Sequence, residues 1–364
     1  MEKDIDIFNL IIEELGLERI VYKILKRFNT FFLDDSLIKL NLSDLELTHI
    51  PDTITKLKNL VNLDLSANQI IQLPDSIGNL TSLEYLNLEN NNLKSLPDSL
   101  FELKKLKFLD IGRNFLSHIS EKIGNLTNLQ RLILIHNNLI FLPNSIKYLS
   151  NLKRIALRSN NLIELPRGIG KLTRLNYLNL QDNLLEILPE EICNLSELTR
   201  LDLRSNRLQS LPQNIGRLQK LERVELSWNA IGKLPSSIEN LKNLRDLGLA
   251  NNMLTELPEG LGNLKKLEIL DLKNNNIKHL PCSFGNLENL NELNIDNNEL
   301  LDLSDGFSDL KSLKFLYLDN NKIKKIPHEI KKLKDLEILS IKDNPDLKID
   351  IDIKNLEKIK RIIK

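Results

Sequence analysis

A 23-residue repeat runs through most of this chain and restricts the folds that are open to it. Written in rows of 23, residues 37–358 form fourteen consecutive rows without an insertion or deletion, which accounts for 322 of the 364 residues. The first row begins at Leu37 and the last at Leu336, and each follows LxxLxLxxNxLxxLPxxIxxLxx. Repetition at a period of about 20–50 residues is typical of arrays in which each unit packs only against its neighbours. The length of the chain therefore does not imply separate globular domains.

Alternating leucines near the start of each row predict a short β-strand. In the second row, Leu63 and Leu65 point to one side and the residue between them to the other, because strand side chains alternate. Equivalent strands of neighbouring rows then pair in parallel, with an advance of about 4.8 Å per row. We therefore expect the leucines to fill a shared core and residues three, five, seven and eight of each row to face solvent.

The Asn and Pro positions of the repeat predict how the chain leaves the strand and returns. The ninth residue is Asn in thirteen rows, and only Leu45 in the first row departs. A side-chain amide can donate to and accept from the backbone groups of the turn, which strand pairing leaves unsatisfied. The fifteenth residue is Pro in eleven rows, and apolar residues spaced by three follow it. This spacing predicts a 3-10 or single-turn helix on the returning side.

The two ends of the array need caps, because a terminal repeat would otherwise expose its core. Residues 1–36 carry Ile5, Phe8, Ile12 and Leu15 at helical spacing, followed by a second apolar stripe, which predicts an N-terminal helical cap. An independent signalling domain is the alternative for this segment, but two short helices bury too little surface to fold alone. After the repeats of 37–358, we expect residues 359–364 to be the end of a C-terminal capping helix.

No residue pattern of catalysis, cofactor binding or metal binding accompanies the repeat. The nearest imitation of a phosphate loop, Gly168-Ile-Gly170-Lys171, lacks the required first Gly and the Ser or Thr after Lys, and the repeat itself explains it. The five histidines lie in different rows and no CxxC pair exists, so no zinc site is expected. Cys193 and Cys282 are too few for a disulfide scaffold. We therefore expect no enzyme activity, no cofactor and no metal.

Charge and hydropathy limit the surroundings of the chain. Lys plus Arg and Asp plus Glu number 50 each, and this balance argues against a protein that coats nucleic acid or an anionic membrane. No apolar run is long enough to span a bilayer, and the acidic N-terminus does not resemble a secretory signal. We therefore expect a cytoplasmic monomer, in which the glycosylation sequons that begin at Asn79, Asn125 and Asn194 are by-products of the repeat.

The solvent-facing side of the strands is the remaining candidate for function. Rows five to nine carry six Arg against three acidic residues there, together with the aromatic and aliphatic side chains that interaction hot spots favour. Charged residues that only keep an open sheet soluble are the alternative, but the outward positions of Ile133 and Ile135 favour binding. The candidate partner-binding residues are Phe108, Arg131, Ile133, Ile135, Arg154, Arg158, Tyr177, Arg200, Arg204, Arg223 and Trp228.

Rows such as residues 198–218, with Leu201, Leu203, Asn206 and Pro212 at the fixed positions, resemble the leucine-rich repeat superfamily in its 23-residue LPxxIGxL type. They are similar to the repeats of Ras-group scaffolds, of bacterial leucine-rich repeat proteins and of Roco proteins, which add a GTPase. The resemblance implies an α/β solenoid, a curved horseshoe with a parallel β-sheet on its concave side and short helical or 3-10 segments on its convex side. It also implies that the concave face binds another protein. No GTPase, kinase or ligase segment accompanies the repeats.

The sequence therefore predicts a non-enzymatic scaffold for signal transduction that binds a partner protein of unknown identity. Two alternatives stay open. In the first, the chain is a recognition subunit or a translocated bacterial effector that acts with a separate catalytic chain. In the second, it binds nucleic acid or glycan through its Arg-rich stretch. Overall neutrality and the acidic last rows argue against nucleic acid, whose binding would depend steeply on salt.

Overall fold

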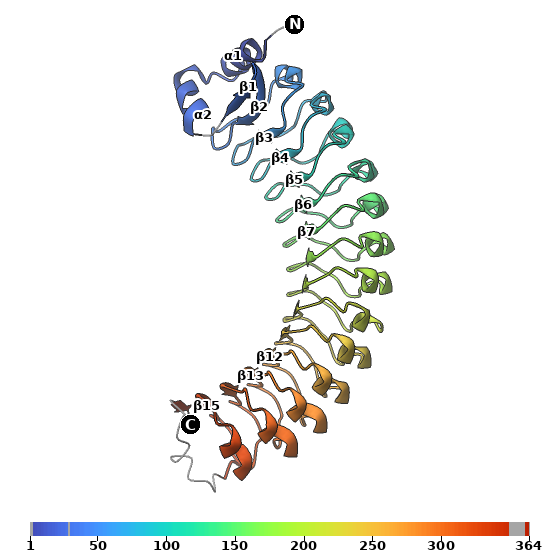
Figure 1. Cartoon of the computed structure of the whole chain (residues 1–364), viewed down its shortest axis with the longest axis vertical. Helices are drawn as coiled ribbons and strands as arrows, with labels where there is room; N and C mark the ends of the chain where they lie inside the picture. Colours follow the sequence, from blue (N-terminus) through green and yellow to red (C-terminus); the bar gives the residue numbers. More distant parts are fainter. Residues whose placement is uncertain (1–2, 28–29, 349–360, 364) are drawn as a thin grey trace. The chain divides into compact units, whose positions relative to one another are not determined.

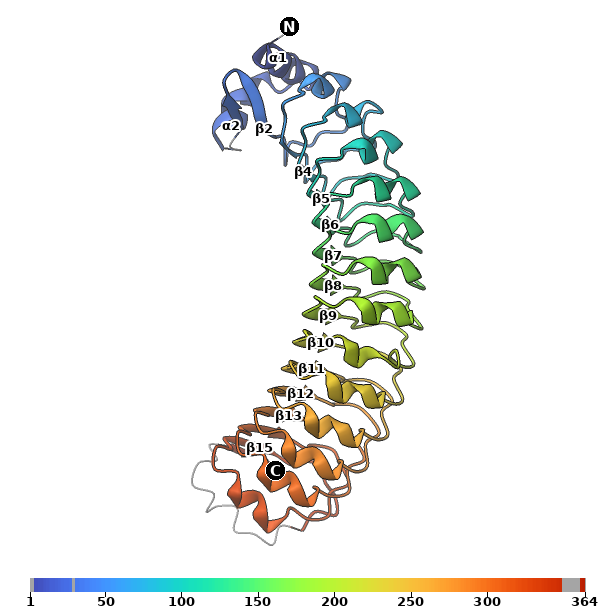
Figure 2. The same ribbon diagram turned by 45° about the vertical axis from the view of Figure 1, so that its right-hand side comes forward.

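The computed structural model describes residues 3–27, 30–348 and 361–363. The chain forms two compact units, Met1–Leu178 and Asn179–Lys364. Within each unit, coils of 23 residues stack with their strands on one side and their 3-10 helices on the other (Figures 1 and 2). The coils of each unit spread apart on the 3-10 side, so the strand side is concave. Each unit is thus the α/β solenoid that the repeat predicts.

Short strands alternate with short helices along the chain. The α-helices and strands are α1 (Asp4–Glu14), α2 (Val21–Arg27), β1 (Phe31–Leu33), β2 (Ser36–Asn41), β3 (Asn62–Asp64), β4 (Tyr85–Asn87), β5 (Phe108–Asp110), β6 (Arg131–Ile133), β7 (Arg154–Ala156), β8 (Tyr177–Asn179), β9 (Arg200–Asp202), β10 (Arg223–Glu225), β11 (Asp246–Gly248), β12 (Ile269–Asp271), β13 (Glu292–Asn294), β14 (Phe315–Tyr317), β15 (Ile338–Ser340) and β16 (Arg361–Ile363). The 3-10 helices are Glu18–Ile20, Asp52–Lys56, Ile77–Asn79, Asp98–Glu102, Glu121–Asn125, Asn144–Tyr148, Arg167–Lys171, Glu190–Asn194, Ile215–Arg217, Ser236–Asn240, Glu259–Asn263, Cys282–Asn286, Asp305–Asp309 and His328–Lys332.

The strands of each unit pair in the register that the repeat requires. From β2 to β7, and again from β9 to β16, each strand residue pairs in parallel with the residue 23 positions later, as Leu40 does with Leu63. Equivalent positions of neighbouring rows therefore lie side by side. The apolar positions fill the interior between strands and 3-10 helices, and in the second row Leu60, Leu63, Leu65 and Ile70 are fully buried. Each such side chain stabilises the fold by about 1.5–3 kcal/mol.

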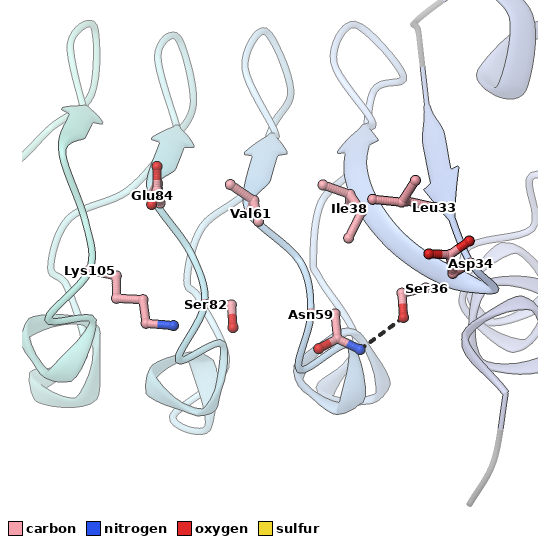
Figure 3. Close-up of a pocket in the computed structure, with 9 residues that line it drawn as sticks. All are labelled: Leu33, Asp34, Ser36, Ile38, Asn59, Val61, Ser82, Glu84 and Lys105. Atoms are coloured by element: carbon pink, nitrogen blue, oxygen red, sulfur yellow. Dashed lines mark hydrogen bonds between the residues drawn. The ribbon is translucent and has the colours of Figure 1, made fainter.

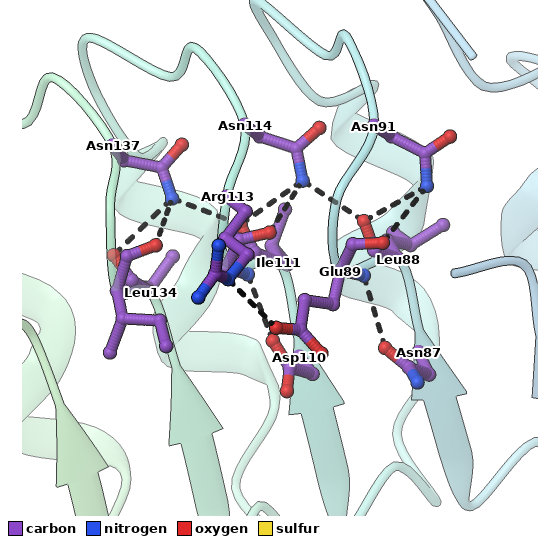
Figure 4. Close-up of polar contacts among 12 residues, drawn as sticks. Asn87, Leu88, Glu89, Asn91, Asp110, Ile111, Arg113, Asn114, Leu134 and Asn137 are labelled. Carbon is purple, nitrogen blue, oxygen red and sulfur yellow. Dashed lines mark hydrogen bonds and ion pairs between the residues drawn. The ribbon is translucent and has the colours of Figure 1, made fainter. Parts of the chain in front are cut away.

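The ninth-position asparagines bind each row to the one before it. The Oδ1 atom of Asn114 accepts from the backbone N–H of Leu93 at 2.9 Å. Its Nδ2 atom donates to the carbonyls of Leu88 and Ile111 at 2.9 and 3.2 Å (Figure 4). Leu88 and Leu93 belong to the preceding row. The same bonds recur at Asn68, Asn91, Asn137, Asn160, Asn206, Asn229, Asn252, Asn275, Asn298, Asn321 and Asn344. This asparagine ladder confirms the role expected for the Asn position.

The residue before the ninth position adopts a left-handed backbone, which the repeat pattern did not reveal. In all fourteen rows the φ angle of the eighth residue lies between 51° and 61°. Apart from Gly, Asn and Asp tolerate this conformation best, and they occupy eight of the fourteen positions. The other six hold residues for which the same turn costs more, namely Ala67, Arg113, His136, Ser159, Ser205 and Trp228.

Helix α1 packs against the first row. Its buried residues are Ile7, Phe8, Ile11 and Ile12. The expected stripe is shifted, because Ile5 is exposed. The helix ends before Gly16, whose φ of +64° suits the residue that follows a helix C-terminus. The carboxylate of Asp4 accepts from the backbone N–H of Leu37 at 2.8 Å, which ties the helix to the first row.

Both ends of the array depart from the purely helical caps that the sequence predicted. Strand β1 pairs antiparallel with β2, and the hairpin turns at Asp34 and Asp35, whose φ angles of 45° and 63° suit a two-residue hairpin loop. At the other end, residues 361–363 form β16, so the expected helix is wrong there. Ile362 pairs with Leu339, 23 residues earlier, because the apolar register of the repeat continues. The rest of that expected helix lies within residues 349–360 and at 364, outside the described residues.

Removal of one ladder side chain should destabilise the fold. Asn137→Ala leaves the N–H of Leu116 without its acceptor and the carbonyl of Ile111 with only the Asn114 amide as side-chain donor, so we expect the free energy of unfolding to fall by about 1–3 kcal/mol. Its exposed neighbour Asn138 has no side-chain hydrogen bond in the described part of the chain, and Asn138→Ala should cost less than about 0.5 kcal/mol. Chemical unfolding followed by circular dichroism measures both, and equal losses would contradict the ladder.

Candidate functional site

The strand face of each unit is the outward surface at positions three, five, seven and eight of the rows. The structure places all of the expected partner-binding residues at these positions. Phe108, Arg131, Ile133, Ile135, Arg154, Arg158 and Tyr177 belong to the first unit, and Arg200, Arg204, Arg223 and Trp228 to the second.

Planar side chains form a line along the strand face of the first unit. Tyr85, Phe108, Arg131 and Arg154 are register partners on β4 to β7, and Tyr177 begins the next strand. The rings of Tyr85 and Phe108 stack with centroids 4.3 Å apart, and the guanidinium carbon of Arg154 lies 4.1 Å from the centroid of Tyr177. Such stacking and cation–π contacts are each worth about 0.5–1.5 kcal/mol. We call these five residues the planar line, and the two contacts orient four of its five side chains.

An apolar strip lies beside the planar line. Ile133 pairs with Ala156, which is buried, and Ile135 packs over Gly112, so that a Cβ atom at Gly112 would lie 2.9 Å from its Cγ1 atom. Both isoleucines are therefore half-buried, and not fully outward as the sequence predicted. They still provide an apolar surface next to the guanidinium groups.

Ion pairs neutralise some of the arginines on the strand face. In the second unit, Nη2 of Arg204 lies 2.6 Å from a carboxylate oxygen of Asp202, and Nε of Arg223 lies 3.0 Å from one of Asp246. Three other arginines are exposed and form no ion pair with any described residue, namely Arg131, Arg154 and Arg200. These three guanidinium groups are accessible and can form bidentate hydrogen bonds with carboxylates.

Trp228 is an exposed aromatic side chain on a costly backbone conformation. Its side chain is 63% exposed, and its φ angle is 61°. Bulky residues rarely adopt this conformation, and such strain persists mainly where the side chain has a functional use. The next four rows carry Asn at this position, and Asn274, Asn297 and Asn320 each donate an Nδ2–H to the preceding amide oxygen, at 2.5–2.8 Å. Trp228 thus differs from the next four rows, where Asn at the same position suits the left-handed backbone and forms hydrogen bonds between rows.

Replacement of Trp228 by Asn should make the protein more stable. Asn relieves the left-handed strain and provides an amide oxygen for the Nδ2 atom of Asn251, so we expect a gain of about 0.5–1 kcal/mol. Trp228→Leu keeps a bulky residue in the same conformation and should give no gain. Melting temperatures measured by calorimetry compare the two, and an Asn variant less stable than the wild type would contradict the strain argument.

Half-buried carboxylates gather on the strand face of the second unit. Burial, followed by repulsion from Asp246, raises the pKa of Glu225 to about 7. Burial likewise raises the pKa of Asp246 and of Asp271. The carboxylate of Glu225 lies over Gly248, where no side chain competes for the space. In the first unit, burial raises the pKa of Asp110 to about 6, although the N–H of Gly112 donates to it (Figure 4). The sequence revealed the acidic residues, but only the packing reveals these shifts.

The raised pKa of Glu225 should make stability depend on pH. Because its pKa is higher in the folded state than in the unfolded state, ionisation opposes folding. The stabilising contribution is fully present below about pH 4.5 and is lost as the pH rises through about 7. The wild type should lose unfolding free energy between about pH 5 and 8. In Glu225→Gln this loss should be smaller by about 1 kcal/mol, a value that allows for the partial exposure of the side chain. Denaturant titrations across this range test it, and an unchanged pH profile in the variant is the opposing result.

The described residues contain no cluster of side chains typical of a metal site and no activated cysteine. Among them, no three His, Cys, Asp or Glu side chains form a group that could hold a metal ion. Burial raises the pKa of the Cys193 thiol to about 12, which keeps it protonated and unreactive, while Cys282 is exposed. None of the helices in this part of the chain has the length and apolar character needed to cross a membrane.

Comparison with known proteins agrees with the geometry of the rows. Family profiles described as leucine rich repeat and leucine-rich repeat region match residues 35–93 and 81–140, and 166–249 and 232–341. The structure of a leucine-rich repeat protein from Leptospira interrogans is 32% identical, with a TM-score of 0.67, and the match covers 86% of this chain and 95% of that chain. This chain belongs to the leucine-rich repeat family.

Other leucine-rich repeat proteins resemble it at lower identity. An internalin of Listeria monocytogenes is 25% identical, with a TM-score of 0.68 over 81% of this chain and 87% of its own. A plant peptide hormone receptor, solved in complex with RGF2, is 26% identical, with a TM-score of 0.65 over 86% of this chain. The present protein spans 62% of that receptor chain. The search of curated proteins found no match.

Proposed function

We propose that this leucine-rich repeat protein is a non-enzymatic scaffold that binds a partner protein through its strand face. The planar line of the first unit is the observation that carries the proposal. Arg131 and Arg154 stand there side by side, exposed and without an ion pair in the described residues, next to the apolar strip of Ile133 and Ile135. Aromatic and Arg side chains beside an apolar surface are the usual composition of protein-binding hot spots.

The chemistry of this face defines the kind of partner that it suits. Two adjacent guanidinium groups repel one another in the free protein, and the carboxylates of an acidic segment relieve this repulsion through bidentate hydrogen bonds. Arg200 and the strained Trp228 extend the proposal to the second unit. The plant receptor with its bound peptide hormone supports a protein or peptide ligand, since it shares the fold at 26% identity. The half-buried carboxylates of the second unit make a nucleic acid a poorer match.

Charge reversal on the planar line tests the proposal. We expect Arg131→Glu with Arg154→Glu to abolish the capture of proteins that the wild type retains in an affinity pull-down. The side chains are exposed, so the melting temperature should change by only a few degrees. Quantitative mass spectrometry compares the captured proteins, and Arg200→Glu is assayed separately for the second unit.

A matched control reverses two charges on the 3-10 side of the same unit. Lys147 and Lys171 are exposed there, and Lys147→Glu with Lys171→Glu alters the net charge by the same amount. This control should capture the same proteins as the wild type. If the control loses them and the planar-line variant keeps them, the binding surface lies on the 3-10 side. Retained material that nuclease removes from both variants would identify a nucleic-acid binder instead.

A further inference from the structure

A groove of about 380 Å³ opens at the N-terminal end of the first unit, beside the β1–β2 hairpin (Figure 3). Its walls come from the hairpin, from the second residue of the first three rows and from the residue that precedes each of the first four rows. None of these positions belongs to the strand face. The groove is therefore a separate surface from the one proposed above.

An aliphatic strip runs along one side of the groove. Leu33 of the hairpin is 54% exposed, and Ile38 and Val61, at the second position of rows one and two, are partly exposed beside it. In all twelve later rows the second residue is polar or charged. The fold therefore does not need an aliphatic residue at this position, and the two exceptions occur only where the groove is.

A polar strip with opposite charges at its ends runs along the other side. Asp34, on the hairpin turn, lies at one end, and Lys105 lies at the other. Between them lie Ser36, Asn59 and Ser82, and Nδ2 of Asn59 donates to the Ser36 hydroxyl at 3.0 Å. Both end residues are exposed, and neither forms an ion pair with another described residue.

The nearby carboxylate of Glu84 does not cancel the charge of Lys105. Its Oε2 atom lies 2.7 Å from Nζ of Lys107, which neutralises it. The groove thus presents a negative end at the hairpin, a positive end at row four, and aliphatic and hydrogen-bonding surfaces between them. A complementary ligand therefore carries a positive group at the hairpin end and a negative group at the row-four end.

The dimensions of the groove match a short extended peptide. From Ser36 to Lys105 there are three row steps, or about 14 Å at the strand spacing, and an extended chain advances about 3.3 Å per residue. We propose that the groove binds an extended peptide segment of about four residues from a partner protein. A basic residue of the segment pairs with Asp34, an aliphatic side chain lies on Leu33, Ile38 and Val61, and an acidic residue pairs with Lys105. Peptide N–H and C=O groups meet the polar side chains between them.

Two synthetic peptides test this proposal on the full chain. Lys-Val-Ser-Glu and Glu-Val-Ser-Lys, both acetylated and amidated, have the same composition but opposite charge order. Titration is followed by the methyl NMR signals of Leu33, Ile38 and Val61. We expect saturable shifts of these methyls, with the peptide of one charge order bound at least about fivefold more tightly than the other. The methyls of Ile133, on the strand face, should not move.

Variants link the binding to the groove. Asp34→Lys with Lys105→Glu should invert the preference between the two peptides. Val61→Lys should weaken binding of the preferred peptide at least about tenfold, because it replaces the aliphatic surface. This variant should fold normally, since Lys107 and Lys153 occupy the same position in other rows. Gln130→Lys introduces the same residue at this position outside the groove and should bind as the wild type does.

Three results would overturn the proposal. One is the absence of saturable methyl shifts up to about 5 mM peptide, because a dissociation constant above this concentration would be too weak for a binding segment. Another is equal binding of both peptides with no inversion in the double variant. The third is a shift at Ile133 in place of Val61, which would put the peptide on the strand face and leave the proposed function intact. Loss of protein capture by the planar-line variant, by contrast, has no bearing on the groove.

Discussion

The fold depends on one interaction, the hydrogen bonding of the ninth-position Asn amide to the backbone of the preceding row. Where the chain leaves each strand, backbone N–H and C=O groups are buried without a strand partner, and an unsatisfied group there costs about 1–3 kcal/mol. Asn114 satisfies a donor and an acceptor of the row before it, at Leu93 and Leu88, as well as a carbonyl of its own row. The repetition of this bond holds the coils in register, and the register aligns the side chains on the strand face.

Because the ladder and the buried leucines hold the coils together, the remaining positions are free to vary. The planar line, the half-buried Glu225 and the strained Trp228 all occupy such positions, and each opposes stability to some extent through charge repulsion, burial of a carboxylate or backbone strain. The solenoid tolerates these costs because each affects only its own row and its neighbours. The aliphatic residues Ile38 and Val61 are a comparable departure at the edge of the first unit.

Most of the fold and part of the candidate site could be predicted from the sequence, and the exceptions have physical reasons. The strands, the 3-10 helices and the role of Asn follow from periodicity and hydrogen-bond chemistry. The left-handed backbone of the eighth residue was missed because residues as different as Ala67 and Trp228 occupy this position. The conformation does not require one residue type, so no repeated letter marks it in the sequence. The pair Arg223–Asp246 was foreseeable, since both are third residues of adjacent rows. The shifted pKa of Glu225 was not, because burial depends on packing over Gly248.

Native-state hydrogen exchange of the eleventh-residue amides tests the central claim most directly. These N–H groups, such as those of Leu93, Leu116 and Leu139, lie in turns that follow the strands, and each donates to a ladder Asn. We expect them to exchange as slowly as the strand amides of the same unit, through a shared cooperative opening. Rapid exchange at these amides beside protected strands would show that the turns open independently, and would contradict the claim that the asparagine ladder holds the rows together.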